Sequence, residues 1–444
     1  MKRELCVFQK IPALLLAGLL AFSICACGTG EDAYVAPAPE AGENMPDTEA
    51  EGVQTQATVP TETLPQGESE EEGIGAWDEP LKDVAVEERP ESIEAASLPM
   101  EEHTGKYYYD RLNEAEQLWY REMYAVMSNM KTEMKLSEEA NETVGAEGLD
   151  KIFNCVMNDN PGLFYVEGYT YTLYTYGDEL DKVAFSGTYS LSADEKTERQ
   201  NRIDREVEAC LAQVAADASE YEKVKYVYEY VICATEYNLE AEDNQNICSV
   251  FLGGESVCQG YAKAVQYLLN ELGIEATLVV GNVHNTESHA WNLVKVDGEY
   301  YYLDATWGDA SYQVQGSGST GVMIPDISYD YLCVPYREMA LTHTMESPVD
   351  MPECTAMEAN YYVMEGAYFN SYDEDVLRTF FEQGYAQGRS FVTFRCADEN
   401  VYGTVLEELI TNQKIFDYLE SADGKVAYAK DDHKLSMTFW LVNE

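Results

Sequence analysis

The chain has 444 residues, of which 45% are apolar and 12% aromatic, and this is enough for two or three domains with a core in each. Lysine and arginine together number 28 against 81 aspartate and glutamate residues, which gives a formal net charge of -53. No basic surface large enough to neutralise phosphates is visible, so the composition argues against nucleic acid as a partner.

The first 27 residues have the pattern of a targeting segment. Three basic residues among the first ten precede the largely apolar run Ile11–Ile24, which is too short to span a bilayer comfortably. The run ends in ICACG at 24–28, which resembles the lipobox of bacterial lipoproteins. The resemblance implies a signal peptide over 1–27, acylation of Cys27 and an extracytoplasmic, lipid-anchored protein. Ordinary signal cleavage and release is the alternative.

Residues 28–104 have the composition of a disordered acidic tether. Between 31 and 102 there are 21 acidic residues against two basic ones, and eight of the 14 prolines fall in this stretch. Such a segment buries too little apolar surface to offset its ordering entropy, and its charges keep it extended. We expect it to hold the folded part away from the membrane, and binding to a basic wall component is the alternative.

The cysteines do not have the pattern of a disulfide scaffold. Eight of the eleven lie beyond the targeting segment, and no CxxC pair occurs among them. We therefore expect mostly buried thiols and no zinc ribbon.

Folded structure is predicted to begin with a helical and strand region over 105–217. Asn113 followed by Glu116 marks the start of its first helix. Periodicity predicts further helices over 149–157, 193–216 and 220–234, and Tyr-rich strands over 163–176 and 183–191.

A cysteine lies at a helix start within the next region, 218–350. Ser256 and Gln259 fit a capping box, which would make Val257 the first helical residue and place Cys258 in the first turn. The unpaired N–H groups and the dipole at that position favour an anion, so a thiol there ionises more readily. Gly260 costs about 1 kcal/mol relative to alanine in a helix, which indicates a close backbone approach.

A predicted hairpin carries a histidine and an aspartate. The run 289–296 reads as a strand, Asp297-Gly298 is a strong turn signal, and 299–307 returns as the second strand. With a two-residue turn, His289 and Asp304 become diagonal neighbours on one face, within reach of a hydrogen bond. A turn longer or shorter by one residue would put them on opposite faces.

Together these three residues have the chemistry of an activated thiol. His289 would deprotonate Cys258 through one ring nitrogen and donate to Asp304 through the other. The thiolate would attack an acyl carbon, and the backbone N–H of Cys258 would receive the oxyanion. A structural cysteine, a satisfied core histidine and a strand-end aspartate are the alternative interpretation of each residue taken alone.

Three blocks resemble the bacterial branch of the transglutaminase-like superfamily of papain-fold proteins: GESVCQGYA at 254–262, HAWN at 289–292 and YLDATW at 302–307. The resemblance implies an α+β fold in which the helix carrying Cys258 packs on an antiparallel sheet carrying His289 and Asp304. It also implies that these residues are the nucleophile, the base and the orienting acid. DNPGLF at 159–164 resembles the amino-terminal part of some bacterial members.

One departure from related thiol enzymes concerns the oxyanion. Those enzymes place a glutamine or aromatic side chain before the nucleophile as a second donor, and here no spacing selects among Asn246, Ser249 and Gln259. His284 and His343 are expected at the rim of the cleft or in structural positions. We expect no cofactor, and the absence of a clustered acid loop gives no indication of a dedicated metal site.

Residues 351–444 are predicted to form a small α+β unit in the order βαβαββ. Its elements are a strand over 361–368, a helix over 374–383, a strand over 390–396, a helix over 402–410 and a hairpin over 425–442. The unit carries no chemical motif, so a binding or scaffolding role is expected.

The sequence thus predicts a surface-anchored thiol acyl enzyme that acts on peptide or amide bonds. Hydrolysis of a protein or cell-wall peptide is expected, because water is the available acceptor unless the site excludes it. Transfer to an amine, as in a protein-glutamine transglutaminase, is one alternative, and a non-catalytic binding module with a papain-like cleft is another. The triad does not decide among these, because specificity lies in the walls of the cleft.

Overall fold

The computed structural model describes residues 93–176, 179–284, 287–309, 327–419 and 426–441, all within the unit Ala57–Glu444. The predicted signal peptide with Cys27 and most of the predicted tether lie outside the described residues. Within the described part of the chain, no helix combines the length and apolar character needed to cross a membrane.

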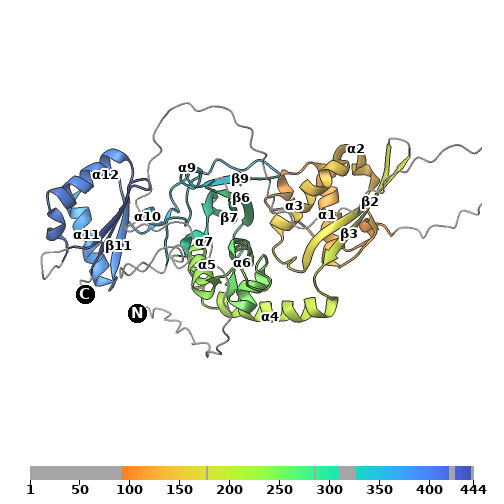
Figure 1. The fold of residues 1–444 in the computed structure, drawn as a ribbon, viewed down its shortest axis with the longest axis horizontal. Coiled ribbons are helices and arrows are strands. Elements are labelled where there is room, and N and C mark those ends of the chain that lie inside the picture. Colours follow the sequence, from red (N-terminus) through yellow and green to blue (C-terminus); the bar gives the residue numbers. More distant parts are fainter. Residues whose placement is uncertain (1–92, 177–178, 285–286, 310–326, 420–425, 442–444) are drawn as a thin grey trace, which may run out of the picture. The chain divides into compact units, whose positions relative to one another are not determined.

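The amino-terminal region packs short helices against a three-stranded sheet of order β1-β3-β2 (Figure 1). Its helices are α1 (Glu114–Ser128), α2 (Asn141–Val144) and α3 (Leu149–Asp159), with 3-10 turns at Ala95–Ser97, Tyr109–Arg111, Glu138–Ala140 and Ala146–Gly148. Its strands are β1 (Met134–Lys135), β2 (Val166–Tyr176) and β3 (Glu179–Tyr189). The predicted capping box at Asn113 is confirmed, because its side chain accepts from Glu116 N while the Glu116 side chain accepts from Asn113 N.

A buried carboxylate joins this region to the neighbouring sheet. Asp159, the first residue of the DNPGLF segment, accepts hydrogen bonds from the backbone of Tyr108 and Tyr109, from the Tyr120 hydroxyl and from the Thr277 hydroxyl, at 3.0 to 3.2 Å. Burial raises the pKa of Asp159 to about 6, although these donors oppose the rise. The segment therefore has a structural role, which is to hold the amino-terminal chain against strand β6, where Thr277 lies.

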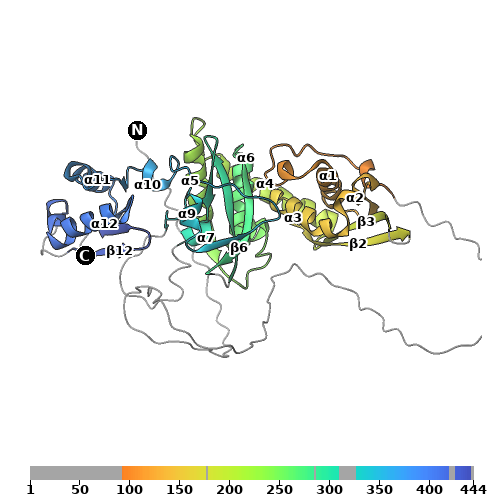
Figure 2. The same ribbon diagram turned by 90° about the horizontal axis from the view of Figure 1, so that it is seen from above.

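The central part of the chain contains an antiparallel sheet of order β8-β7-β6-β9. Helix α6 packs against β7 and β6, and Figure 2 shows α6 beside the sheet that contains β6. Its strands are β6 (Ala276–Val283), β7 (Glu287–Val296), β8 (Glu299–Leu303) and β9 (His343–Glu346). Its helices are α4 (Ala193–Leu211), α5 (Glu220–Ala234), α6 (Cys258–Glu271), α7 (Ala305–Gly308) and α9 (Tyr336–Met339), with a π-helical turn at Ser249–Gly253. The short strands β4 (Glu236–Tyr237) and β5 (Glu255–Ser256) pair in parallel. A helix packed on an antiparallel sheet is the α+β arrangement that the sequence predicts.

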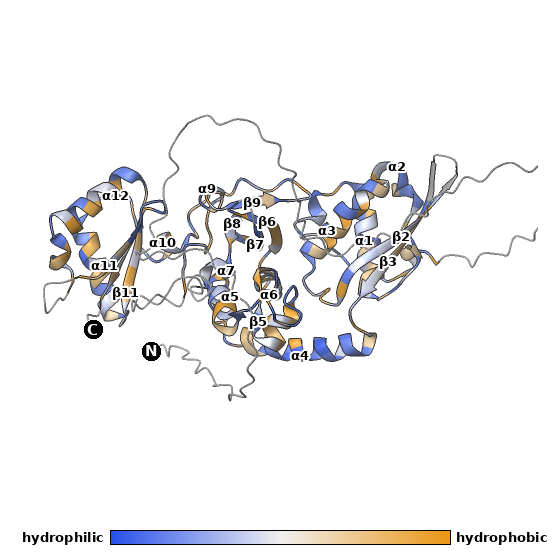
Figure 3. Cartoon of the chain, viewed as in Figure 1, coloured by the Kyte–Doolittle hydropathy of each residue, from blue (hydrophilic) through white to orange (hydrophobic). Residues whose placement is uncertain are grey.

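The two long helices before the sheet differ in how much surface they bury. Helix α4 is mostly hydrophilic and buries only Ile203, Val207 and Cys210 (Figure 3). Helix α6 is buried along most of its length, from Gly260 to Leu269. A helix buried on several sides is held by its surroundings, so the residue at its first position has a fixed place.

The register of the predicted hairpin is confirmed. Val296 pairs with Glu299 across Asp297-Gly298, and the pairing continues as far as Asn292 with Leu303. Both turn residues have positive φ, 51° for Asp297 and 89° for Gly298, as a two-residue type I′ turn requires. Strand β8 ends at Leu303, so Asp304, which was predicted to lie in the returning strand, lies one residue beyond it.

The predicted capping box at the start of α6 is wrong. Val257 is the N-cap and Cys258 the first helical residue, and Val257 provides no side-chain cap. The Ser256 hydroxyl is buried and lies 2.7 Å from Ser249 Oγ and 3.1 Å from Asn244 O, so it is not available to the helix. The close approach at Gly260 is confirmed, because a Cβ there would lie 1.9 Å from Ser256 Oγ.

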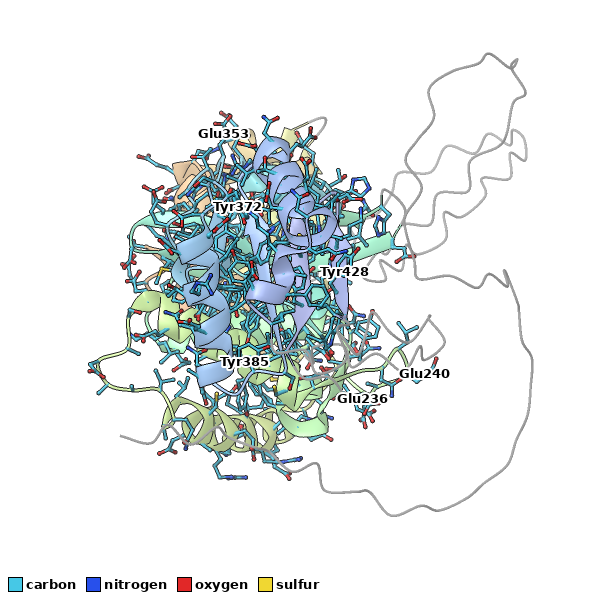
Figure 4. All side chains as sticks on the ribbon, turned by 90° about the vertical axis from the view of Figure 1, so that its left-hand side faces the viewer. Glu236, Glu240, Glu353, Tyr372, Tyr385 and Tyr428 are labelled. Atoms are coloured by element: carbon cyan, nitrogen blue, oxygen red, sulfur yellow. The ribbon has the colours of Figure 1, made fainter. Side chains whose placement is uncertain are left out.

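The carboxy-terminal unit has the predicted order βαβαββ in a sheet of order β10-β11-β13-β12. Its elements are β10 (Tyr368–Phe369), α11 (Glu374–Ala386), β11 (Phe391–Cys396), α12 (Glu399–Leu406) with a π-helical turn at Glu407–Thr411, a 3-10 turn at Lys414–Asp417, β12 (Tyr428–Asp431) and β13 (Ser436–Trp440). Figure 4 looks onto these elements and shows Tyr372, Tyr385 and Tyr428 among their side chains.

The strand predicted over 361–368 is wrong except at its end. Residues Tyr361–Met364 form the helical turn α10, which the Asn360 side chain starts by accepting from Tyr362 N at 3.1 Å. Gly366, with φ +68°, ends the turn, and only Tyr368–Phe369 pairs as a strand. A local side-chain cap therefore overrides the strand propensity of the tyrosines.

Ion pairs attach the carboxy-terminal unit to the chain that follows the hairpin. Lys434 Nζ lies 2.6 Å from Asp330 Oδ2, and Arg395 lies 2.5 Å from Glu338. Burial alone would raise the pKa of Asp330, but Lys434 and Arg395 hold it low, at about 2. These charged pairs fix the segment 327–340, which reaches the site described next.

Candidate active site

Cys258 lies at the first position of α6 with its side chain partly exposed. The first N–H groups of a helix have no acceptor within the helix. In the described part of the chain, the backbone N–H groups of Cys258 and Gln259 donate to no other group. An oxygen that gains negative charge beside the thiol would therefore meet unused donors.

His289 faces this thiol from strand β7. The Asn292 side chain, three residues further along β7, donates to Ala262 O on α6 at 2.9 Å and holds the helix against the strand. His289 is 6% exposed, and its Nε2 lies 2.8 Å from Asp304 Oδ2. Cys258 lies near enough to raise the pKa of His289, after Asp304. The structure thus brings the three residues together.

Asp304 is held by several donors rather than one. It leaves the sheet after β8 and becomes the N-cap of α7, where its Oδ1 accepts from Thr306 N at 2.9 Å and from Trp307 N at 3.1 Å. Its own backbone N–H donates to Tyr331 O at 3.0 Å. The aspartate is therefore fixed by helix capping as well as by the sheet, and the predicted strand end is in fact a helix start.

The charge of Asp304 determines which ring nitrogen of His289 carries a proton. Burial alone would raise the pKa of Asp304, but His289 and His343 hold it well below its usual range, so the carboxylate is ionised. An ionised carboxylate only accepts, so His289 must carry a proton on Nε2, and Nδ1 is the ring nitrogen that remains available to Cys258. Burial lowers the pKa of His289, but Asp304, and after it Cys258, raise it to about 10.

His343 is a second partner of the same carboxylate. Its Nε2 lies 3.1 Å from Asp304 Oδ2 and its Nδ1 lies 2.8 Å from Thr342 Oγ1. It is 3% exposed, so the structural position expected for it is observed and the rim position is not. The sequence offers no signal that relates it to an aspartate 39 residues earlier, because strand β9 is too short to show a period.

Aromatic rings enclose the two imidazoles. Trp291 stacks beside His289 at 6.0 Å and meets His343 edge-on at 4.9 Å. Trp307 lies 6.2 Å from His289 and 4.9 Å from His343. The walls exclude water from the His289–Asp304 bond, which strengthens it. His284 is exposed, and its ring centre lies 5.3 Å from that of Trp307.

The structure separates the three candidates for a second oxyanion donor. Ser249 is buried, with its hydroxyl donating to Asn246 O at 2.7 Å beneath the helix start. The side chain of Asn246 accepts from Cys248 N at 2.8 Å and donates through Nδ2 to Asp243 Oδ1 at 3.5 Å, so both ends of its amide are used within the loop. Gln259 is half-buried next to Cys258 and makes no side-chain hydrogen bond within the described residues. Gln259 is the candidate whose amide is uncommitted.

In the described part of the chain, His289, Asp304 and His343 are the group of side chains that could hold a metal ion. The ligand atoms of His289, Asp304 and His343 lie within 4.8 Å of one another. Their N···O separations of 2.8 and 3.1 Å are those of hydrogen bonds, shorter than the roughly 3.3 Å between ligands of a tetrahedral zinc ion. These separations fit hydrogen bonds between the side chains better than joint coordination of a metal ion.

Cys258 differs from most other described cysteines. Six of the eight are buried, Cys258 is partly exposed and Cys233 is exposed. Burial raises the pKa of Cys210 and Cys248 to about 11 and that of Cys155, Cys354 and Cys396 to about 12. The mostly buried thiols expected from the sequence are confirmed, and among the described cysteines only two thiols are accessible to a reagent.

Comparison with known families gives one match. Residues 208–305, which include α5, α6, β6, β7 and β8, match the model of the transglutaminase-like superfamily. No curated protein matches the chain.

Several solved structures are similar to parts of the chain. A crystal structure of a TGase has a TM-score of 0.23 and 16% identity over 36% of this chain and 47% of its own. A candidate cysteine protease from Cytophaga hutchinsonii has a TM-score of 0.22 and 14% identity over 31% of this chain and 61% of its own. The periplasmic domain of TgpA from Pseudomonas aeruginosa, bound to ethylmercury, has a TM-score of 0.20 and 19% identity over 30% of this chain and 58% of its own. The chain thus covers less than two thirds of each.

Proposed function

We propose that this chain, whose residues 208–305 match the model of the transglutaminase-like superfamily, is a thiol acyl enzyme that hydrolyses peptide or amide bonds through Cys258, His289 and Asp304. One observation carries the proposal. A buried, ionised aspartate accepts a hydrogen bond from His289 Nε2, which leaves Nδ1 as the ring nitrogen available to the thiol at a helix start.

The first half of the reaction forms a thioester. In the resting pair, the thiol proton of Cys258 resides on His289 Nδ1, and Asp304 stabilises the imidazolium. The thiolate attacks the carbonyl carbon, and the backbone N–H groups at the start of α6 receive the oxyanion. His289 then gives its proton to the departing amine nitrogen, the C–N bond breaks, and the acyl group stays on sulfur.

The second half of the reaction hydrolyses the thioester and regenerates the enzyme. His289, now neutral, takes a proton from water while the water oxygen attacks the thioester carbon. The C–S bond breaks, the carboxylic acid leaves, and the thiolate–imidazolium pair forms again. An amine in place of water would give transfer instead. Because the Cys258 side chain is partly exposed, water is the acceptor we propose.

The setting of the reaction is proposed from the amino-terminal sequence. ICACG at 24–28 supports a lipid on Cys27, and the acidic stretch after it supports a tether. An enzyme held outside the membrane would meet proteins and cell-wall peptides, which is the substrate class we propose. Labelling cells with radioactive palmitate tests the anchor: we expect label in the wild-type protein of the membrane fraction and none in Cys27→Ser.

Alkylation of Cys258 tests the activated pair without knowledge of the substrate. The protein is prepared with Cys233→Ser, which removes the other accessible thiol among the described cysteines, and iodoacetamide labelling of the Cys258 peptide is followed from pH 5 to 10. We expect fast labelling below the free-thiol pKa of about 8.5, which His289→Ala abolishes. Labelling that follows an ordinary thiol in both proteins would exclude the enzyme and leave a binding module.

An amine donor then separates hydrolysis from transfer. Casein is incubated with the protein and a biotin-labelled primary amine, and new peptide termini and biotin incorporation are measured together. Hydrolysis predicts new termini without incorporation, and transfer predicts the reverse. Cys258→Ser must abolish whichever signal appears.

A further inference from the structure

Two imidazoles donate to one oxygen of the buried aspartate. His289 Nε2 lies 2.8 Å and His343 Nε2 lies 3.1 Å from Asp304 Oδ2. The proposed reaction uses the first contact only. The second contact gives a buried imidazole N–H its acceptor, and that acceptor is the oxygen that also holds His289.

The hydrogen-bond network fixes the form of His343. Since the Asp304 carboxylate can only accept, His343 must carry its proton on Nε2. Its Nδ1 lies 2.8 Å from the Thr342 hydroxyl, which is its second hydrogen-bonding partner. Each nitrogen has one partner, so the ring is a fixed donor aimed at Asp304.

The surroundings of His343 allow it little movement. Its side chain has no exposed surface, and Trp291 and Trp307 contact it from two sides at 4.9 Å. Strand β9 holds its backbone to β6 through the pairing with Val283. A rigid donor can fix the carboxylate that it contacts.

We propose that His343 is a positioning residue for the reaction proposed above, acting through Asp304. Thr306 N and Trp307 N hold Oδ1, and His343 holds Oδ2, so the carboxylate plane stays aimed at His289. Without His343, Oδ2 keeps a single donor and the carboxylate can turn. The imidazolium of His289 is then less well held, and the thiolate of Cys258 with it.

The test measures iodoacetamide labelling of Cys258 against pH in the Cys233→Ser background. His343→Leu keeps an apolar filling and removes the donor, while His343→Gln keeps an N–H near the position of Nε2. We expect labelling at pH 6 to fall about tenfold in His343→Leu, the scale of one lost hydrogen bond to a charge, and to recover largely in His343→Gln. His103→Leu is the matched control, since it removes another buried imidazole, which packs among Tyr109, Tyr120 and Tyr124.

Each outcome bears on the proposal. Wild-type labelling in His343→Leu, or equal losses in the Leu and Gln variants, would overturn the positioning role. If His343→Leu does not fold, Thr342→Val removes only the hydroxyl that fixes the ring, and an unchanged pH profile there would also overturn it. If wild type and His289→Ala label equally fast, the proposed function itself is overturned. The two failures are therefore distinct.

Discussion

Asp304→Asn is the substitution whose effect the structure predicts in most detail. The new amide would keep an acceptor for Thr306 N and Trp307 N but would turn an N–H toward both imidazoles. His289 would then have to accept on Nε2 and carry its proton on Nδ1, so it could not take the proton of Cys258. The fold should survive, because asparagine is also a good N-cap.

The magnitude follows from the protonation of His289. Its pKa is raised from the ordinary 6.5 to about 10, so the site holds this proton about 5 kcal/mol more tightly than a free imidazole does. Asp304 supplies most of this and offsets the cost of burial, so the substitution removes the main source of the shift. An unactivated thiol at pH 6 is ionised in only about one molecule in 300, which sets the largest drop that alkylation can report.

The assay is iodoacetamide labelling of Cys258 at pH 6 in the Cys233→Ser background. Because a more acidic thiolate is also a weaker nucleophile, we expect a drop of about 30-fold rather than the full ~300-fold. Asp309→Asn is the matched control, since Asp309 is also a buried carboxylate and bonds Tyr261. A folded Asp304→Asn protein that labels as fast as wild type would refute the reasoning.

Three further predictions concern stability. Gly260→Ala should lower the free energy of unfolding, measured in urea, by about 3 kcal/mol, because the new Cβ has no space beside Ser256 Oγ. Gly403→Ala, with open space around the new Cβ, should raise that free energy by about 0.5 kcal/mol. Equal effects of the two substitutions would contradict the close approach at Gly260. Because the pKa of His289 is raised to about 10, its proton stabilises the fold fully below about pH 6.5, and this contribution is lost as pH rises through about 10. His289→Gln should therefore flatten the fall in melting temperature over that window. A curve of melting temperature against pH that runs parallel to that of the wild type would argue against a buried imidazolium. Lys434→Met should cost about 2 kcal/mol, because Asp330 loses the cation paired with it at 2.6 Å. Adding Asp330→Asn should restore part of the loss, and purely additive losses would contradict a coupled pair.

Local sequence signals predicted the elements that carry the site. The Asp297-Gly298 turn set the register of β7 and β8, because a two-residue loop with positive φ at both positions allows one pairing only. Gly260 indicated a close approach that the Ser256 hydroxyl in fact makes. In both cases the physical cause lies within a few residues of the signal.

Features that depend on distant contacts were not predictable. The Ser256 hydroxyl is bound by Ser249 and Asn244, which displaces the expected capping box, and no local pattern shows that competition. The contact of His343 with Asp304 depends on β9 joining the sheet beside β6 after a long connection. Neither the strand pairing nor the charge of the carboxylate can be read from the segment 341–346.

Acyl transfer to sulfur is the central claim, and mass spectrometry of an acyl adduct tests it most directly. Wild-type protein is mixed with p-nitrophenyl acetate at about pH 7, quenched in acid, and mapped for acetyl groups on each cysteine peptide. We predict rapid acetylation of Cys258 ahead of the exposed Cys233, followed by loss of the acetyl group to water, with both steps slowed in His289→Ala. Acetylation of Cys233 in preference to Cys258, or an adduct on Cys258 that forms equally fast without His289, would contradict the account.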